Sequence, residues 1–132
     1  MTADRYSLAV VLSSGEPERL YTGLSLLVSA AVDRERCAAL ATFRGLGLLC
    51  APDLRQLAMQ PEQSPELAPN RRDTFARSLD ELRDTAFSLE TLDLYACSAS
   101  VDLMTVDTAR FAGVLSMPRF LQATAGARLV AL

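Results

Sequence analysis

A single cysteine, Cys97, lies where a strand-like run of residues meets the expected start of a helix. Residues 92–96, LDLYA, have the character of a strand, and Ser98, Ala99 and Ser100 lead into the first turn of the helix that follows. Open α/β sheets bind ligands at the carboxyl ends of their strands, and amide groups at the start of a helix favour a thiolate over a thiol. This setting predicts a reactive thiol at Cys97, and the alternative is a buried, inert cysteine.

Two serines and a second cysteine complete the candidate site. Ser98 and Ser100 could donate hydrogen bonds to the sulfur, and capping of the short helix is the alternative role for both. Cys50 could act as a second thiol that approaches Cys97 and resolves a persulfide or a sulfenate. Its alternative is a cysteine packed within a loop. Cys37 opens an apolar strand, so we expect it to be a core residue.

A second group of residues could bind an anion. Ser13, Ser14 and Gly15 separate a predicted strand from a predicted helix, where backbone amides can hold a negative group. The segment lacks the full glycine-rich fingerprint, so an ordinary strand-to-helix turn is the alternative. Arg44 and Arg119 stand beside predicted turns and could also bind an anion, and the alternative for both is a solvated surface side chain.

The composition limits the chemistry that the chain can perform. It has 132 residues, no histidine and a formal net charge of −3, and all 13 basic residues are arginines spread without a basic stripe. We therefore expect no nucleic-acid partner. The absence of histidine excludes a Cys-His or Ser-His pair within the chain, and the remaining ligand types are not grouped as a zinc site requires. We expect no metal and no cofactor.

Cysteine usage and hydropathy indicate the compartment. Three cysteines at wide spacing, with no CxxC, form a poor disulfide framework, so reduced thiols in the cytoplasm are the expectation. No run approaches ~18 apolar residues, so no membrane span is expected. The stretch 1–15 contains an apolar run, but the run is short and leads into a turn, and the stretch carries Asp4. A strand therefore explains it better than a signal peptide. Half of all residues are hydrophobic, which indicates a large core, a subunit interface, or both.

The N-terminal third predicts two buried strands separated by a long helix. Residues 7–13 form a continuous apolar run, which is typical of a central parallel strand. Helix 16–32 would bury one apolar face. Three further apolar residues broaden that face: Leu26, Ala30 and Val32. A second surface of this helix could therefore contact another subunit. The second strand is predicted over 37–43.

The middle of the chain combines an irregular segment with the clearest helix. Four prolines exclude a long helix from segment 44–70, which we predict to be an irregular loop with a short helical piece over 53–59. Helix 71–89 follows, with its apolar residues on one face. Asn70 or Asp73 could cap this helix, and Asp73 forms a favourable i,i+4 pair with the arginine one turn later.

The C-terminal third alternates short strands and helices. The predicted strands are 92–96, 113–116 and 127–132, and the predicted helices are 100–104 and 118–124. Together with the rest of the chain, this alternation predicts a single α/β domain over residues 1–132. A mostly parallel sheet of about five strands would lie between helices on both faces, which is a three-layer αβα fold.

Four segments, taken in order, match the pattern of one known family. The first is the strand, turn and helix start VVLSSGEPERLYTGLSL, and the second is the strand that ends in Phe43 with a glycine-containing loop after it. The third is ACSASVDLM, which is similar to a Cys-x-x-Ser-x-Asp-x-Met segment at Cys97, Ser100, Asp102 and Met104. The fourth is the tail GVLSMPRFLQATAGARLVAL. The chain thereby resembles the DsrE/DsrF-like family of small sulfur-relay proteins, closest to its peroxiredoxin-like branch.

This resemblance implies a DsrE-like three-layer fold, a homo-oligomer that is a trimer or hexamer, and sulfur chemistry at Cys97. In sulfur-transferring members, a cysteine in this region carries sulfur as a persulfide and passes it to the thiol of a partner protein. We therefore expect a carrier of sulfane sulfur with a thiol-bearing donor or acceptor, rather than a stand-alone enzyme. The alternative is a non-catalytic oligomeric module that binds a small anion or nucleotide at the carboxyl ends of the strands. A third hypothesis is a scaffold that only assembles.

Overall fold

A parallel sheet of five strands forms the centre of the molecule in the computed structural model, which describes residues 5–132. The strands lie in the order β4-β3-β2-β1-β5, and every neighbouring pair is parallel. They are β1 (Leu8–Leu12), β2 (Cys37–Ala41), β3 (Leu92–Cys97), β4 (Gly113–Leu115) and β5 (Arg128–Ala131). The predicted α/β fold with a five-stranded parallel sheet is confirmed.

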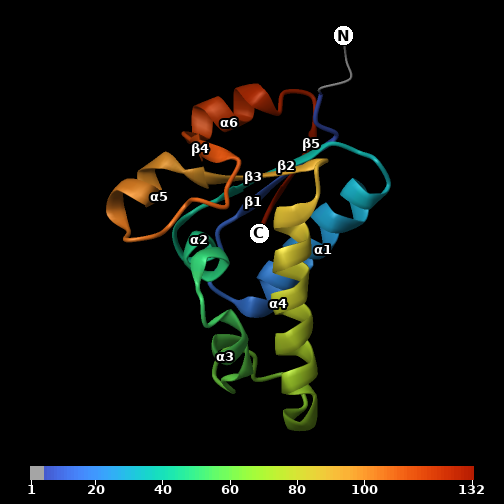
Figure 1. Ribbon diagram of the computed structural model, residues 1–132, viewed down its shortest axis with the longest axis vertical. Coiled ribbons are helices and arrows are strands. Elements are labelled where there is room, and N and C mark those ends of the chain that lie inside the picture. Colours follow the sequence, from blue (N-terminus) through green and yellow to red (C-terminus); the bar gives the residue numbers. More distant parts are fainter. Residues whose placement is uncertain (1–4) are drawn as a thin grey trace.

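Helices cover both faces of the sheet, as a three-layer αβα fold requires (Figure 1). One face carries α1 (Pro17–Val32) and α4 (Arg72–Ser88), and the opposite face carries α6 (Met117–Ala123). The remaining helical elements are α2 (Phe43–Cys50), α3 (Leu54–Met59), a 3-10 turn η1 (Pro69–Arg71) and α5 (Ser98–Leu103). Within residues 5–132, no helix is long and apolar enough to cross a bilayer.

The face under α1 and α4 holds the larger core. Leu20, Leu24 and Leu27 of α1 are at most 2% exposed, and their spacing is that of one helical face. Gly23 lies between them because α1 runs very close to β1. A Cβ at Gly23 would lie 2.4 Å from Cδ2 of Leu12, so a larger residue would force the Leu12 side chain or the helix to shift.

A smaller apolar cluster fills the space between the sheet and α6. Its buried members are Ala9, Ala38, Leu40, Cys97 and Phe120. Phe120 is fully buried and is the member that α6 contributes. Side chains alternate along β3, so Leu94 and Ala96 join the larger core while Tyr95 and Cys97 face α6. Cys97 thus belongs to the face that a single short helix covers.

Segment 44–70 is more regular than its prolines and glycines predict. The short helix expected over 53–59 is present as α3, but most of α2 also falls in this segment, so the prediction of an irregular loop was wrong there. The glycines that argue against a helix serve its packing. A Cβ at Gly45 would lie 2.2 Å from the carbonyl oxygen of Leu12. Close approach of α2 to β1 therefore outweighs the weak helix propensity of glycine.

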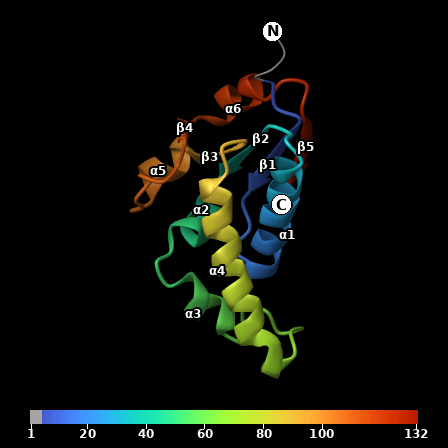
Figure 2. The same ribbon diagram turned by 45° about the vertical axis from the view of Figure 1, so that its right-hand side comes forward.

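The start of α4 also differs from the prediction. Neither Asn70 nor Asp73 caps the helix. Asp73 accepts a hydrogen bond at 3.0 Å from Arg55 of α3, and it also forms the predicted i,i+4 pair with Arg77. Helix α3 lies beside the end of α4 that is distant from the sheet (Figure 2). The carboxylate therefore joins two helices instead of ending one.

Candidate functional site at the carboxyl edge of the sheet

Cys97 is the last residue of β3 and the residue directly before α5, so no loop separates the strand from the helix. The strand register places Cys97 beside Leu115 of β4, and it places Ala96 beside Ala41, the last residue of β2. The thiol therefore stands at the carboxyl edge of a parallel sheet. The sequence pattern predicted that the strand would end one residue earlier, at Ala96, and it correctly predicted a strand-to-helix junction at Cys97.

The Cys97 side chain packs within the smaller apolar cluster. It is 6% exposed, and its neighbours in that cluster include Leu40, Leu115 and Phe120. It makes no capping hydrogen bond to α5. A reagent or donor molecule must therefore displace a side chain of the cluster before it can reach the sulfur.

Ser100 is fully buried and contacts a neighbouring turn. Its Oγ accepts a hydrogen bond at 2.9 Å from the amide of Phe43, the first residue of α2. Phe43 has a φ of 43°, a left-handed conformation that costs about 1–2 kcal/mol for a residue with a side chain. Ser100 thus stabilises the sharp turn from β2 into α2, a role that differs from both roles expected for it. Ser98, the first residue of α5, is partly exposed.

The turn that was considered as a possible anion site is already paired within the chain. The amides of Ser13 and Ser14 donate to the carbonyl oxygen of Leu132 at 2.8 and 3.3 Å, and Ser13 Oγ donates to the same oxygen at 2.8 Å. Ser14 Oγ accepts a hydrogen bond from the amide of Glu16 just before α1. These contacts fix the end of β5 to the turn after β1, so they serve the fold.

A hollow opens beside this turn, next to the ends of β1 and β2. It encloses about 440 Å³ and is lined by Gly15, Arg44, Gly47, Leu48, Leu57, Gln63 and Met104. Gly15 cannot carry a side chain there because a Cβ would lie 2.9 Å from Cβ of Arg44. Arg44 is exposed and forms no ion pair within residues 5–132. An arginine beside an apolar floor is suited to a small anionic ligand.

The other two thiols belong to the larger core, on the opposite side of the sheet from Cys97. Cys50 ends α2, and its Sγ donates to the carbonyl oxygen of Asp107 at 3.5 Å. Burial raises the pKa of Cys50, and the nearby Asp107 carboxylate raises it further. Cys37 is a buried core residue, as expected, and burial raises its pKa to about 11. All three cysteines are free.

Sequence reasoning missed a polar cluster on the face that α6 covers. Tyr6 Oη donates to the carboxylate of Asp93, which also pairs with Arg36 at 3.0 Å. Tyr6 Oη lies 3.2 Å from Tyr95 Oη, and the Arg36 guanidinium lies 4.9 Å from the centre of the Tyr6 ring. Burial, and then the bond to Asp93, raise the pKa of Tyr6, so its hydroxyl stays protonated and donates to the Asp93 carboxylate. The alternation Asp93, Tyr95, Cys97 was the signal in the sequence.

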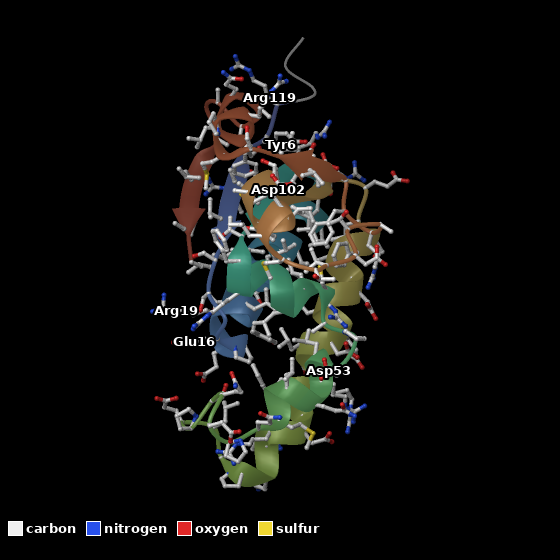
Figure 3. All side chains as sticks on the ribbon, turned by 90° about the vertical axis from the view of Figure 1, so that its left-hand side faces the viewer. Tyr6, Glu16, Arg19, Asp53, Asp102 and Arg119 are labelled. Carbon is white, nitrogen blue, oxygen red and sulfur yellow. The ribbon has the colours of Figure 1, made fainter. Side chains whose placement is uncertain are left out.

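The remaining charged candidates lie on the surface. Arg119 is exposed on α6, where Ser116 Oγ accepts a hydrogen bond from its amide. Asp102 is exposed on α5 and does not cap that helix. Figure 3 shows Arg119 toward the same end of the molecule as Tyr6, whereas Glu16 lies toward the other end. In the part of the chain that the structure describes, no cluster of cysteine and carboxylate side chains is suited to hold a metal ion.

The fold and the edge geometry define a class: a parallel three-layer α/β domain with a cysteine at the carboxyl edge of its sheet. No protein-family model matches the chain, and no curated protein is significantly similar to it. Evidence for function therefore comes from the chain's own residues and from the segments that resemble the DsrE/DsrF-like pattern.

Proposed function

We propose that this protein is a DsrE-like carrier of sulfane sulfur and that Cys97 holds the sulfur as a persulfide. The observation that carries the proposal is the position of the thiol. Cys97 closes β3 at the carboxyl edge of the sheet, directly before α5, where open α/β folds place their ligands. The similarity of segment 96–104 to the cysteine segment of that family supports the same residue.

The other two cysteines are poor candidates for this role. The nucleophile in sulfur transfer is the thiolate. Burial raises the pKa values of Cys37 and Cys50, which keeps both thiols protonated at neutral pH. Both also lie away from the face that carries Cys97. We therefore assign sulfur transfer to Cys97 alone, without a resolving thiol from the same chain.

The proposed chemistry is two successive thiol–disulfide-type exchanges. The Cys97 thiolate attacks the outer sulfur of a donor persulfide, the sulfur–sulfur bond of the donor breaks, and the donor leaves as a thiolate. An acceptor thiolate then attacks the outer sulfur on Cys97, and Cys97 leaves as a thiolate. Each step forms one sulfur–sulfur bond and breaks one, so no external oxidant or reductant is needed.

Access to the thiol is controlled by the smaller apolar cluster. With Cys97 only 6% exposed, the donor reaches it when Leu115 or the helix that carries Phe120 moves. Helix α6 has seven residues and covers its face alone, so its displacement leaves the larger core intact. We therefore expect the rate of sulfur uptake to follow this local opening.

Intact-mass measurement after incubation with a persulfide donor tests the proposal. Wild type should gain one sulfur atom, the gain should be lost in Cys97→Ser, and it should persist in the matched control Cys50→Ser. A small thiol added afterwards should remove the extra sulfur. A gain that persists in Cys97→Ser, or the absence of any gain in wild type, would contradict the proposal.

A second candidate function is supported by the hollow at the ends of β1 and β2. Its volume of about 440 Å³ suits a small ligand, and the exposed Arg44 supplies a positive charge beside apolar side chains. We propose binding of a small anion or nucleotide there as the alternative to sulfur carriage. It would make Cys97 incidental to function.

Thermal-shift measurements with phosphate, sulfate and nucleotides separate the two candidates. Ligand binding in the hollow predicts stabilisation that is lost in Arg44→Gln, kept in Cys97→Ser, and kept in the control Arg119→Gln, which removes an exposed arginine elsewhere. An absence of stabilisation by every ligand would exclude this alternative and leave the sulfur proposal unaffected.

A further inference from the structure

Strand β5 leaves one row of backbone groups unpaired at the edge of the sheet. The amides of Arg128 and Leu132 donate toward β1, to Ser7 at 3.0 Å and Val11 at 2.8 Å. Because backbone groups alternate in direction along a strand, the amides of Leu129 and Ala131 point away from β1. No other strand within residues 5–132 pairs with that side.

This edge lacks the features that usually keep an exposed strand single. Edge strands of monomeric proteins are normally protected by charges, prolines, bulges or covering loops. Strand β5 reads RLVA, and its one charge, Arg128, stands at the start and pairs with Glu35 at 3.4 Å. Leu129 is 55% exposed. The strand at the other edge, β4, has only three residues and offers a shorter template.

An apolar groove runs beside the same edge, between β5 and the outer flank of α1. It encloses about 670 Å³, and the residues that matter here are Tyr21, Ser25, Leu26, Ser29 and Val130. Leu26 is 41% exposed although it lies in a helix that otherwise packs on the sheet. The unpaired strand edge and the open groove are therefore parts of one continuous surface.

We infer that this surface is the interface between two copies of the chain, in which β5 pairs antiparallel with β5 of the second copy. A second copy fits because a two-fold axis perpendicular to the sheet brings like faces together. Residues that lie directly opposite each other in this antiparallel pair must then point to the same face of the sheet. The axis therefore passes through a residue of β5, either Leu129 or Val130, and not between two residues. The axis through Val130 sets Leu129 opposite the partner's Ala131, and each such pair exchanges both of its backbone hydrogen bonds.

The alternative axis, through Leu129, carries the pairing out of β5 into the turn before it. It would set Ala131 opposite the partner's Ala127, whose amide already donates to the carbonyl oxygen of Thr124 within its own chain. The axis through Val130 also places the two α1 helices side by side on one face of a continuous sheet. Leu26 and Tyr21 of each copy then fill the groove of the other, and Ser25 and Ser29 leave room for them. This inference is independent of the sulfur chemistry.

Light scattering on the full chain at micromolar concentration tests the interface. The wild type should have twice the monomer mass of 14.3 kDa, which is the mass of a dimer and not of the trimer or hexamer that the family resemblance implies. Ala131→Pro removes one outward amide without touching the bonds to β1, so it should give a folded monomer. The control Leu103→Lys changes an exposed leucine of α5, outside the proposed interface, and should remain dimeric.

A second variant guards against misfolding at the strand. Leu26→Asp charges the groove without altering β5, and it should also give a monomer with a wild-type circular dichroism spectrum. A wild type of 14.3 kDa at micromolar concentration would overturn the inference. So would a folded Ala131→Pro or Leu26→Asp protein that keeps the wild-type mass. A monomer that binds an extended peptide at β5 would show that the edge serves another partner.

Discussion

The two faces of the sheet are covered very differently. Under α1 and α4 lies an apolar core with fully buried leucines such as Leu24, Leu27 and Leu79. The opposite face is covered by the seven residues of α6, and it carries both Cys97 and a polar cluster around Asp93. This difference indicates that one face supplies most of the stability and that the other face is where a thiol can be uncovered.

Local opening is easiest where few apolar contacts must be broken. In the smaller cluster Phe120 is the one fully buried aromatic ring, whereas the larger core is shared by many side chains. Substitutions on the two faces should therefore differ in their effects on stability and on access to Cys97.

Phe120→Ala should be the most destabilising change on the face that α6 covers. Loss of a fully buried ring costs about 3–5 kcal/mol of unfolding free energy, and it would also expose Cys97 to thiol reagents. Urea unfolding and alkylation kinetics measure the two effects. The control Leu121→Ala alters the next residue, which is 46% exposed, and should change neither by much. Equal losses in both variants would mean that Phe120 does not close the cluster.

Arg83→Met should produce the next largest loss of stability, on the face that α1 and α4 cover. The Arg83 guanidinium is buried, and it donates to the carbonyl oxygens of Leu48, Leu49 and Ala51 at the end of α2, at 3.3, 3.3 and 2.6 Å. Its removal takes this donor from the carbonyl oxygens of Leu49 and Ala51, whereas Leu48 still accepts from the amide of Ala51. The loss should cost about 3 kcal/mol. Arg77→Met, on an exposed part of the same helix, should cost less than about 1 kcal/mol. Similar losses would show that the buried contacts add nothing.

Ser100→Ala should destabilise the protein by about 1 kcal/mol, because it leaves the amide of Phe43 without its acceptor at the start of α2. Ser98→Ala, two residues earlier, should cost no more than about 0.5 kcal/mol. Thermal unfolding of the two variants measures the difference. If sulfur uptake falls in Ser100→Ala while stability is unchanged, the hydroxyl serves Cys97 and not the turn.

Alkaline pH should lower the stability of the protein through Cys37, which lies in the core under α1 and α4. Its folded pKa of about 11 lies above the ordinary value of 9.0, so its contribution to stability is complete below pH 9.0 and is lost as the pH rises toward about 11. Urea unfolding across this range should show a decline that is shallower in Cys37→Ala. Cys50 and Tyr6 also have raised pKa values, so part of the decline should remain. An unchanged slope in Cys37→Ala would contradict the assignment.

Much of the fold could be predicted because its strands are continuous apolar runs and its long helices have one apolar face. The sheet, α1, α4 and the position of Cys97 all follow from such local patterns. Helix α2 could not be predicted, because Gly45 is required only by the close approach of Leu12, which is distant in the sequence.

The contacts that the site residues make could not be predicted from the sequence. Ser100 contacts a residue 57 positions away, and Ser13 contacts Leu132 at 119 positions. No local pattern reports such pairs. The burial of Cys97 depends in the same way on Phe120, which arrives from another element. The sequence could therefore place the thiol at the edge of the sheet but could not show what covers it.

The most direct test of the account is whether the Cys97 thiol can be reached while the protein stays folded. The native protein is treated with iodoacetamide, quenched, unfolded, treated with a second alkylating reagent of different mass, and mapped by peptide mass spectrometry. The account predicts that Cys97 carries the first label well before Cys37 does. Labelling of Cys97 only by the second reagent, together with Cys37, would contradict it.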